Sequence, residues 1–317
     1  MKKAAAVLLG WLCAATAWAA DSYPARPVKI IVASGPGSGD DFATRVVANE
    51  LSNILRQQFI VENRPGAGGV IGQTAVLKSP PDGYTLLLAG GSMAGAKFVN
   101  AAVTYDVLKD FTPISTIETS PFALVSSPTL PAKDLKEFIA HARSQPGKLT
   151  FGTIGAGQVP WWAVFLFNSM AGVKAVEVTY KDTAGATTDV MTGRLDYFVA
   201  PLVGALAVKD KLRALGVTSA ERSAMMPDVP SVAEAGLAGY DMPAWRSIMG
   251  PAGMPADVVE ILNKGIQRSL ASPDLRDKFA KAGSVPLGST PAELRKRYEL
   301  WMGIFEKIAK DAGVKPQ

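Results

Sequence analysis

The sequence is poor in the residues that build disulfides, metal sites and most hydrolytic triads. Its 317 residues include one cysteine, Cys13, and one histidine, His141. A single cysteine excludes a disulfide framework and a cysteine-based zinc site, and a single histidine excludes a multi-histidine metal site. A triad that needs histidine as its base has only His141 available. We therefore expect no metal.

Charged residues are also sparse, at 19% of the chain against 48% hydrophobic residues. This balance excludes an intrinsically disordered chain, and the length suffices for one large domain or two ordinary ones. The net charge is +5, and the sequence has no Lys/Arg cluster of the kind that grips nucleic acid. We expect no nucleic-acid partner.

Residues 1–19 have the pattern of a secretory signal peptide. Lys2 and Lys3 form a positive start, an apolar run follows from Ala4 to about Ala17, and Ala17-Trp18-Ala19 fits the small-x-small cleavage pattern. The apolar run is shorter than the roughly 20 residues that span a bilayer. We expect cleavage after Ala19 and a periplasmic product.

The rest of the chain alternates between strand and helix patterns. Two α/β blocks are followed by three C-terminal helices, which predicts parallel sheets covered by helices. The first block has strand patterns at Val28–Ala33, Phe59–Val61 and Tyr84–Leu88, with a helix that Asp40 or Asp41 caps after the first strand. The second block has strand patterns at Phe122–Val125, Leu149–Phe151, Val176–Thr179, Tyr197–Val199 and Leu212–Val217.

Two glycine-rich loops, residues 34–39 and 152–158, each lie between a strand and a helix, one in each block. Such a loop presents backbone N–H groups at a helix N-terminus, where the helix dipole also favours an anion. Open α/β sheets bind ligands at the carboxyl ends of their strands. We therefore expect the two loops to face each other across one cleft and to enclose an anion.

Two motifs suggest an enzyme as the alternative to an anion-binding protein. Gly35-Pro36-Gly37 after a strand is similar to a dinucleotide fingerprint, but Asp40 stands where its third glycine belongs. Gly90-Gly91-Ser92-Met93-Ala94 is similar to a nucleophile elbow but ends in alanine, and its only base would be His141. The alternative function that stays open is an exported hydrolase with a glycine-loop serine. We expect no cofactor.

A series of short motifs runs through nearly the whole chain after the leader. They are Tyr23-Pro24 with Pro27-Val28, the glycine loop with Asp41, Val61-Glu62-Asn63-Arg64-Pro65-Gly66-Ala67-Gly68-Gly69, Pro81-Asp82-Gly83-Tyr84, Gly152 to Gly157, Pro227-Asp228-Val229-Pro230 and Pro251-Ala252-Gly253. In this order they resemble the periplasmic solute receptors of the tripartite tricarboxylate transporter family, also called Bug-type receptors.

The resemblance implies a two-domain periplasmic-binding-protein clamshell, type II-like, with two inter-domain crossings near Pro121 and Met242. Residues 22–121 with 243–317 would form one domain and residues 122–242 the other. Such a receptor is a monomer without catalysis that captures a small carboxylate and delivers it to a membrane permease. The resemblance also implies that the two strand-to-helix loops hold the carboxylate, largely through backbone N–H groups and ordered water.

Two departures from the family pattern bear on the ligand. Trp161 stands where the family usually has histidine, and Ala200 where it often has aspartate. A tryptophan can cover an aromatic or apolar body, and a missing acid removes a partner for an ammonium group. We therefore expect a carboxylate with an aromatic or extended body, such as an extended dicarboxylate, rather than an amino acid. The alternative is that Trp161 packs in the core.

The ligand-binding prediction combines the loop residues with a charged candidate. Arg246 can pair with a carboxylate through its guanidinium fork, or with a local acid instead. The predicted ligand-binding residues are Ser34, Gly37, Ser38, Asp41, Gly91, Ser92, Thr153, Gly155, Gly157, Gln158, Trp161, Tyr180, Asp182 and Arg246.

Overall fold

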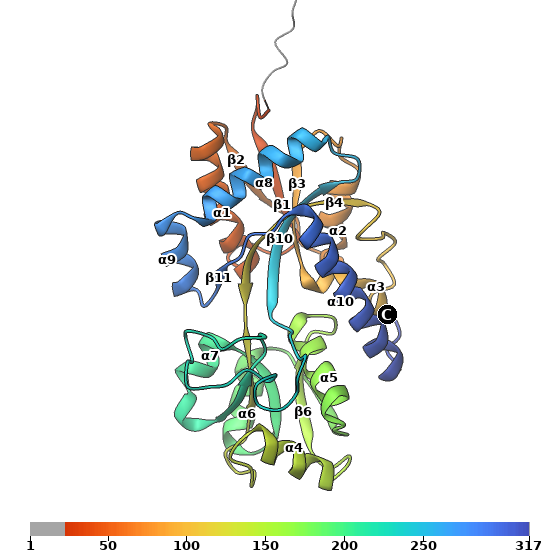
Figure 1. Cartoon of the computed structure of the whole chain (residues 1–317). Coiled ribbons are helices and arrows are strands. Elements are labelled where there is room, and N and C mark those ends of the chain that lie inside the picture. The colour runs from red at the N-terminus through yellow and green to blue at the C-terminus, as the bar shows by residue number, and fades with distance from the viewer. Residues whose placement is uncertain (1–22, 317) are drawn as a thin grey trace, which may run out of the picture.

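The computed structural model describes residues 23–316, which form two α/β lobes, each with its own sheet (Figure 1). The predicted signal peptide, residues 1–19, lies outside the described residues. Among residues 23–316, no helix combines the length and the apolar character that crossing a membrane requires.

The first lobe is built on a six-stranded sheet with the order β11-β4-β10-β3-β1-β2. Its strands β1, β2 and β3 are parallel, and β10 runs antiparallel to its neighbours β3 and β4. The strands are β1 (Val28–Val32), β2 (Phe59–Asn63), β3 (Thr85–Gly90), β4 (Phe111–Ser120), β10 (Ala244–Pro251) and β11 (Val285–Pro286). The helices are α1 (Gly39–Leu55), α2 (Val70–Leu77), α3 (Ala96–Val99), α8 (Ala256–Leu270), α9 (Pro273–Lys281) and α10 (Pro291–Asp311), with short turns η1 (Ala67–Gly69) and η2 (Gly91–Ala94).

The second lobe is built on a five-stranded sheet with the order β7-β6-β8-β5-β9. Strand β6 is parallel to β7 and β8, whereas β5 is antiparallel to β8 and β9. The strands are β5 (Phe122–Ser126), β6 (Thr150–Ile154), β7 (Val176–Tyr180), β8 (Tyr197–Pro201) and β9 (Arg213–Val217). The helices are α4 (Leu135–Ser144), α5 (Val159–Ala171), α6 (Thr183–Thr192) and α7 (Leu202–Ala207), with a short turn η3 (Lys209–Lys211).

The chain passes between the two sheets twice. Strand β4 of the first sheet ends at Ser120 and β5 of the second begins at Phe122, so that only Pro121 lies between them. The return runs through residues 218–243, from β9 to β10. Because β10 lies between β3 and β4, the returning chain enters the middle of the first sheet.

Helix α1 follows β1 after the loop of residues 33–38, and its N-cap residue differs from the predicted one. Ser38 is the N-cap residue, and its Oγ accepts a hydrogen bond from the Asp41 N–H at 3.2 Å. Asp40 and Asp41 lie within the first turn instead of capping the helix, and their negative charges there favour the helix dipole. The backbone of Ser38 is extended, which is the conformation that an N-cap residue adopts.

Helix α10, from the first lobe, reaches across and packs on α5 of the second (Figure 1). The ring of Phe305 stacks on Trp162, with centroids 4.3 Å apart and an interplanar angle of 20°. One cluster of buried apolar residues therefore includes side chains from both lobes. Burial of this surface stabilises one arrangement of the lobes, because apolar burial contributes roughly 25 cal/mol per Å².

Candidate functional site

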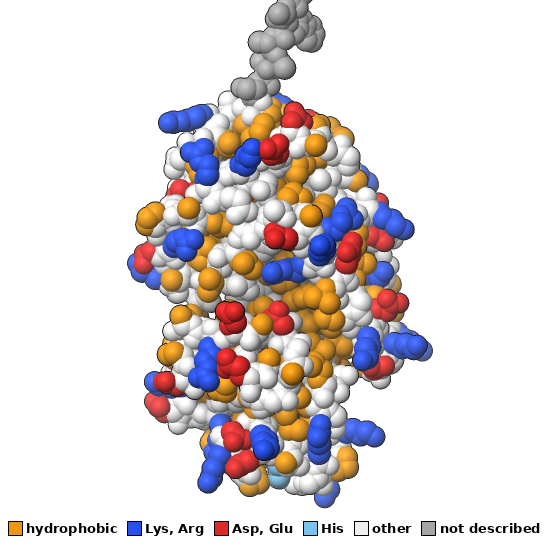
Figure 2. Space-filling view, viewed as in Figure 1, with side chains coloured by type: hydrophobic (Ala, Val, Ile, Leu, Met, Phe, Trp, Pro, Cys, Tyr) orange, Lys and Arg blue, Asp and Glu red, His pale blue; other side chains and the backbone are white. Residues whose placement is uncertain are grey.

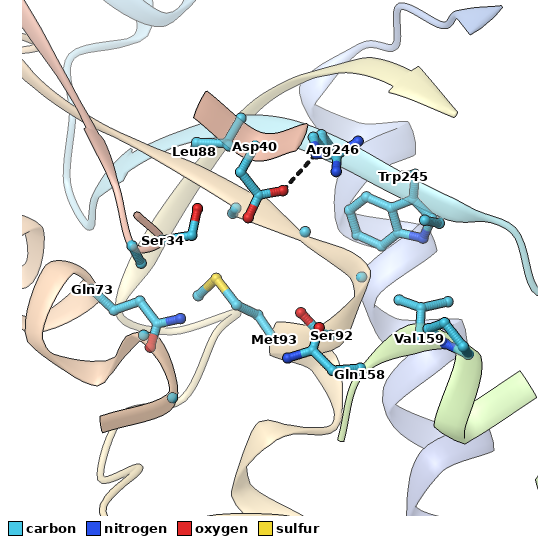
Figure 3. A pocket seen from close by; sticks show the side chains of 18 of the residues that line it. Ser34, Asp40, Gln73, Leu88, Ser92, Met93, Gln158, Val159, Trp245 and Arg246 are labelled. Carbon is cyan, nitrogen blue, oxygen red and sulfur yellow. Dashed lines mark hydrogen bonds and ion pairs between the residues drawn. The ribbon is translucent and has the colours of Figure 1, made fainter. Parts of the chain in front are cut away.

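A cavity of about 430 Å³ lies between the two lobes, beside strand β10, where the returning chain enters the first sheet. Its lining combines loops of the first lobe, the start of β5 and the start of α5 (Figure 3). The lining residues are Ala33, Ser34, Asp40, Gly66, Gly68, Gly69, Gln73, Leu88, Ala89, Gly90, Gly91, Ser92, Met93, Phe122, Gln158, Val159, Pro160, Ala244, Trp245 and Arg246.

The parallel strands of the first sheet explain this position. The segments that follow β1, β2 and β3 all leave from the same edge of the sheet, and each contributes to the lining. A parallel sheet binds ligands at this carboxyl edge, where loops diverge and helices begin. Gly91 lies where a side chain has no room, because an added Cβ would be 2.3 Å from Cζ3 of Trp301.

The polar side chains of the lining come from both lobes. Ser34 Oγ is 2.8 Å from Ser38 Oγ, which keeps it at the mouth of the first glycine loop. The Tyr105 hydroxyl donates to Oε1 of Gln73 at 2.7 Å, so the amide group of Gln73 can present its Nε2 donor to the cavity. Ser92 and Gln158 complete the set, and both are labelled in Figure 3.

The helix N-termini at the cavity differ in charge. Helix α5 has no acidic residue in its first turn and its N-cap, Gln158, makes no capping bond through its side chain. Pro160 has no N–H, so the N–H groups of Val159 and Trp161 are those that stay available to an anion. Helix α1 carries Asp40 and Asp41 in its first turn. The electropositive end of the cavity thus lies at α5, and an acidic group stands at α1.

That acidic group belongs to an ion-pair cluster with Arg246. The Arg246 Nε donates to Oδ1 of Asp40 at 2.6 Å, and its Nη1 donates to Oε1 of the buried Glu118. Burial alone would lower the pKa of Arg246, but the fields of Glu118 and Asp40 and their hydrogen bonds raise the pKa above its usual value. Arg246 therefore stays charged and pairs with two local acids.

The apolar side chains of the lining form a second group, the apolar wall. Met93, Phe122, Trp245 and Val159 present side chains along it. The indole Nε1 of Trp245 is buried and has no hydrogen-bond partner within residues 23–316. An unpaired buried N–H is costly, by about 1–3 kcal/mol, so this wall also holds one donor in need of an acceptor.

The structure brings five of the predicted residues together at the cavity. Ser34, Gly91, Ser92, Gln158 and Arg246 all line it, although they come from segments far apart in the sequence. Their ligand contacts stay predictions.

Three predicted residues of the first glycine loop hold the loop instead of lining the cavity. Asp41 accepts hydrogen bonds from the Gly37 N–H and from Arg45 Nε, both at 2.9 Å. The hydrogen bond from Arg45 is the main cause that lowers the pKa of Asp41 to about 2; burial opposes it, and the Gly37 and Asn63 bonds assist. Ser38 caps α1 as described above. Gly37, Ser38 and Asp41 thus shape the wall behind Ser34.

Two predicted residues of the second lobe converge on Glu177 rather than on the cavity. Thr153 Oγ1 donates to Glu177 Oε1 at 2.7 Å, and Trp161 Nε1 donates to the same oxygen at 3.0 Å. Trp161 is only 5% exposed and packs against Phe165, with ring centroids 4.3 Å apart. The structure therefore gives Trp161 the packing role that the sequence left open as its alternative.

The remaining predicted residues also lie outside the lining. Gly155 and Gly157 belong to the loop before α5, where Trp162 Nε1 donates to the Gly157 carbonyl at 3.0 Å. The Tyr180 hydroxyl donates to Asp189 at 2.9 Å, and Asp182 caps α6 through the Gly185 N–H. Tyr180 ends the edge strand β7, and neither Tyr180 nor Asp182 lines this cavity.

Two other positions used in the sequence argument are also away from the cavity. Ala200 is 2% exposed and packs in the core of the second lobe, so its lack of a carboxylate does not alter the cavity. His141 lies on α4, where its Nε2 is 3.3 Å from Gln145 Nε2. It is absent from the lining that contains Ser92. Within residues 23–316, no group of three or more metal-binding side chains forms a candidate metal site.

Several lining residues escaped the sequence analysis. The loop Gly66, Gly68 and Gly69 precedes α2, so it is a third glycine-rich segment between a strand and a helix, and that signal could have found it. The sequence predicts Asp40 as a helix cap and as a departure from the dinucleotide fingerprint, but not as a cavity residue. Gln73 and Trp245 carry no local signal, because only the packing of α2 and β10 brings them to the cavity.

The chain matches the model of a known protein family over residues 43–296, described as the tripartite tricarboxylate transporter family receptor. Protein BugT of Bordetella pertussis is 34% identical over 296 residues, which cover 91% of this chain and 91% of that protein.

Two solved structures are similar throughout. Rpa4515 of R. palustris, solved with adipate, is 32% identical with a TM-score of 0.75, and the match covers 93% of this chain and 100% of that chain. MatC from Rhodopseudomonas palustris, solved with bound malate, is 29% identical with a TM-score of 0.71, and the match covers 90% and 100%. These likenesses confirm the predicted two-domain α/β clamshell.

Proposed function

The chain belongs to the tripartite tricarboxylate transporter receptor family, and from this premise we propose that it captures a small carboxylate in the cavity between its two lobes. The family and its solved relatives are solute-binding receptors and not enzymes, so the exported-hydrolase alternative is set aside. Similar receptors hold adipate and malate, both small carboxylates.

The observation that carries the proposal is the convergence of neutral donors from both lobes on one cavity. Ser34, Gln73 and Ser92 come from the first lobe, and the open N-terminus of α5 comes from the second. A carboxylate accepts up to four such hydrogen bonds, and bonds to a charged group are the strong ones. The cation in the lining, Arg246, is already paired with Asp40 and Glu118.

The apolar wall supports a ligand with an extended or aromatic body. The expectation of such a body rested on Trp161, which is buried elsewhere; Phe122 and Trp245 supply the aromatic surface in its place. Such faces cover apolar carbon well, and a pocket of this kind orients its ligand through a few polar groups. Carboxylates with an extended aliphatic body and carboxylates with an aromatic body both fit this description.

The two-lobed architecture supports a role in transport. A ligand that touches both lobes favours the closed form by its difference in affinity for the two forms. We place the receptor in the periplasm, where receptors of this family act, after removal of residues 1–19, and we assign delivery to a membrane permease. A single chain completes the cavity, which supports a monomer. No bond is made or broken.

Isothermal titration calorimetry of the purified protein with mono-, di- and tricarboxylates, aromatic ones included, tests the proposal. We expect at least one to bind, and we expect the double variant Ser34→Ala, Ser92→Ala to weaken that binding about tenfold or more, because it removes two donors. The exposed Ser144, which bonds to the His141 carbonyl on α4, provides the control Ser144→Ala with unchanged binding. Binding of no carboxylate contradicts the proposal.

A further inference from the structure

Asp40 presents a carboxylate oxygen to the cavity. Its Oδ1 accepts from Arg246, and its side chain remains 43% exposed although the residue lines the cavity. Its Oδ2 has no hydrogen-bond partner within the described part of the chain, residues 23–316. Figure 3 shows the second oxygen turned toward the space between Ser34 and Met93.

Hydrogen bonds within this cluster already engage the Arg246 guanidinium. Its Nε is bonded to Asp40 and its Nη1 to Glu118. Its Nη2 lies against the backbone of α1, because a Cβ added at Gly39 would be 2.9 Å from it. Two of the three guanidinium nitrogens are therefore bonded to acids, and through its Nε bond Arg246 acts as a positioning residue that fixes Asp40.

Two carboxylates share one guanidinium, so the cluster carries one net negative charge. Glu118 is 1% exposed, and the excess charge therefore reaches the cavity through Asp40. In a partly buried site like charges repel strongly, whereas a hydroxyl or an ammonium donor is attracted. The cavity is thus acidic at the α1 end and rich in donors at the α5 end.

We propose that Asp40 selects a bifunctional ligand with a carboxylate at one end and a hydrogen-bond donor, a hydroxyl or an ammonium group, at the other. This inference rests on the proposed function, since the α5 end must hold the carboxylate. A dicarboxylate places its second negative charge against Asp40 and is disfavoured. The expectation against amino acids rested on the absence of a carboxylate at Ala200, but Ala200 is buried and does not line the cavity. Asp40 does line the cavity, and it provides a carboxylate that can pair with an ammonium group.

Calorimetry with matched probes tests the selection. Each set shares one chain length and differs only in the distal group: β-alanine, β-hydroxypropionate and malonate; γ-aminobutyrate, γ-hydroxybutyrate and succinate; ε-aminocaproate, ε-hydroxycaproate and adipate. At the length that fits, we expect the amino or hydroxy acid to bind about tenfold or more tightly than the dicarboxylate. Asp40→Asn removes the charge at almost constant size, and it should reverse or erase that order.

Glu50→Gln is the matched control. It removes one negative charge from the same helix, ten residues along and so about 15 Å from Asp40. The order of the probes should not change in this variant. Circular dichroism and the unfolding temperature show whether each variant is folded.

Four outcomes overturn the inference. Tightest binding of a dicarboxylate to the unaltered protein does so directly. An equal gain in affinity for every probe in the Asp40→Asn variant means that Asp40 only competes with the ligand for Arg246. Binding of simple carboxylates without binding of any bifunctional probe overturns the inference while the proposed function survives, whereas binding of no carboxylate at all overturns both.

Discussion

Asp40 and Asp41 are neighbours in the first turn of α1, but their carboxylates serve different purposes. Asp40 faces the cavity, whereas Asp41 is buried and bonds to the Gly37 N–H and to Arg45. Successive residues of a helix point about 100° apart, so two adjacent acids cannot share one direction. Asp41 therefore matters for the stability of the glycine loop, and its contribution should depend on pH.

Asp41→Asn should lower the free energy of unfolding by about 1–3 kcal/mol near neutral pH, because it weakens hydrogen bonds to a charged, buried acceptor. Because the pKa of Asp41 is lowered to about 2 in the folded protein and is about 3.9 in an unfolded chain, its stabilisation is present above about pH 4. The stabilisation is lost as the pH falls from there toward 2. Urea unfolding of both proteins at pH 7, 5, 4 and 3 measures the difference.

The stability gap between the two proteins should narrow from about pH 4 downward and stay constant above pH 5. A gap that is independent of pH means that the loss is steric and that the Asp41 charge contributes nothing.

The positions of the glycine loops could be predicted from the sequence, but the directions in which individual side chains point could not. The direction of Asp40 depends on which residue caps α1, and the cap is Ser38, two or three residues before the acids to which the prediction assigned it. The partners of Arg246 could not be predicted for the same reason. Its pairing with a local acid was one of two open alternatives, and only the packing of β4 beside β10 brings Glu118 within reach.

The loop before α5 depends on a glycine that meets the other lobe. Gly157 has φ of +81°, and a Cβ there would be 2.5 Å from Cγ2 of Val99 on α3. Gly157→Ala should therefore weaken carboxylate binding about tenfold or more, because the loop and the start of α5 must shift away from the first lobe. Gly147→Ala is its control, since Gly147 has a similar φ of +77° and nothing within 4 Å of an added Cβ.

Both variants should lose roughly 1–2 kcal/mol of stability from the left-handed backbone alone. Only Gly157→Ala should change the dissociation constant in calorimetry. Equal binding by the two variants means that contact between this loop and α3 is irrelevant to the ligand.

Among the elements, the alternating strands and helices around β1, β2 and β3 could be predicted, because buried parallel strands form short apolar runs. Strands β4 and β10 could not. Strand β4 contains Pro113 and buries polar Ser115, Thr116 and Glu118, which find their partners in Ser289 and Arg246. A strand whose buried side chains are satisfied only by distant residues carries no local apolar signal.

The whole molecule is held together by more than its two chain crossings. Helix α10 bridges the lobes, with Phe305 stacked on Trp162, and Figure 2 shows apolar side chains along the waist on the side of α10. On the same face, Lys and Arg are spread over both lobes among Asp and Glu rather than gathered into one patch. The resemblance to a receptor family implied the clamshell, but no sequence pattern indicated this bridge.

Phe305→Leu should loosen the arrangement of the lobes. The substitution replaces the stacked ring with a smaller side chain and lowers the free energy of unfolding by about 1–3 kcal/mol. It therefore favours more open forms, which bind ligand poorly. Phe279→Leu is the matched control, because Phe279 is equally buried but lies on α9 within the first lobe. Small-angle X-ray scattering should give a larger radius of gyration for Phe305→Leu alone. Equal radii for the two variants contradict a bridging role of α10.

The most direct measurement is a crystal structure of the protein with its tightest-binding carboxylate. We expect the carboxylate at the N-terminus of α5, within hydrogen-bond distance of Ser92, and the other end of the ligand beside Asp40. A ligand bound anywhere else, for example in the separate hollow lined by Phe165, Asn168 and Ile308, contradicts it.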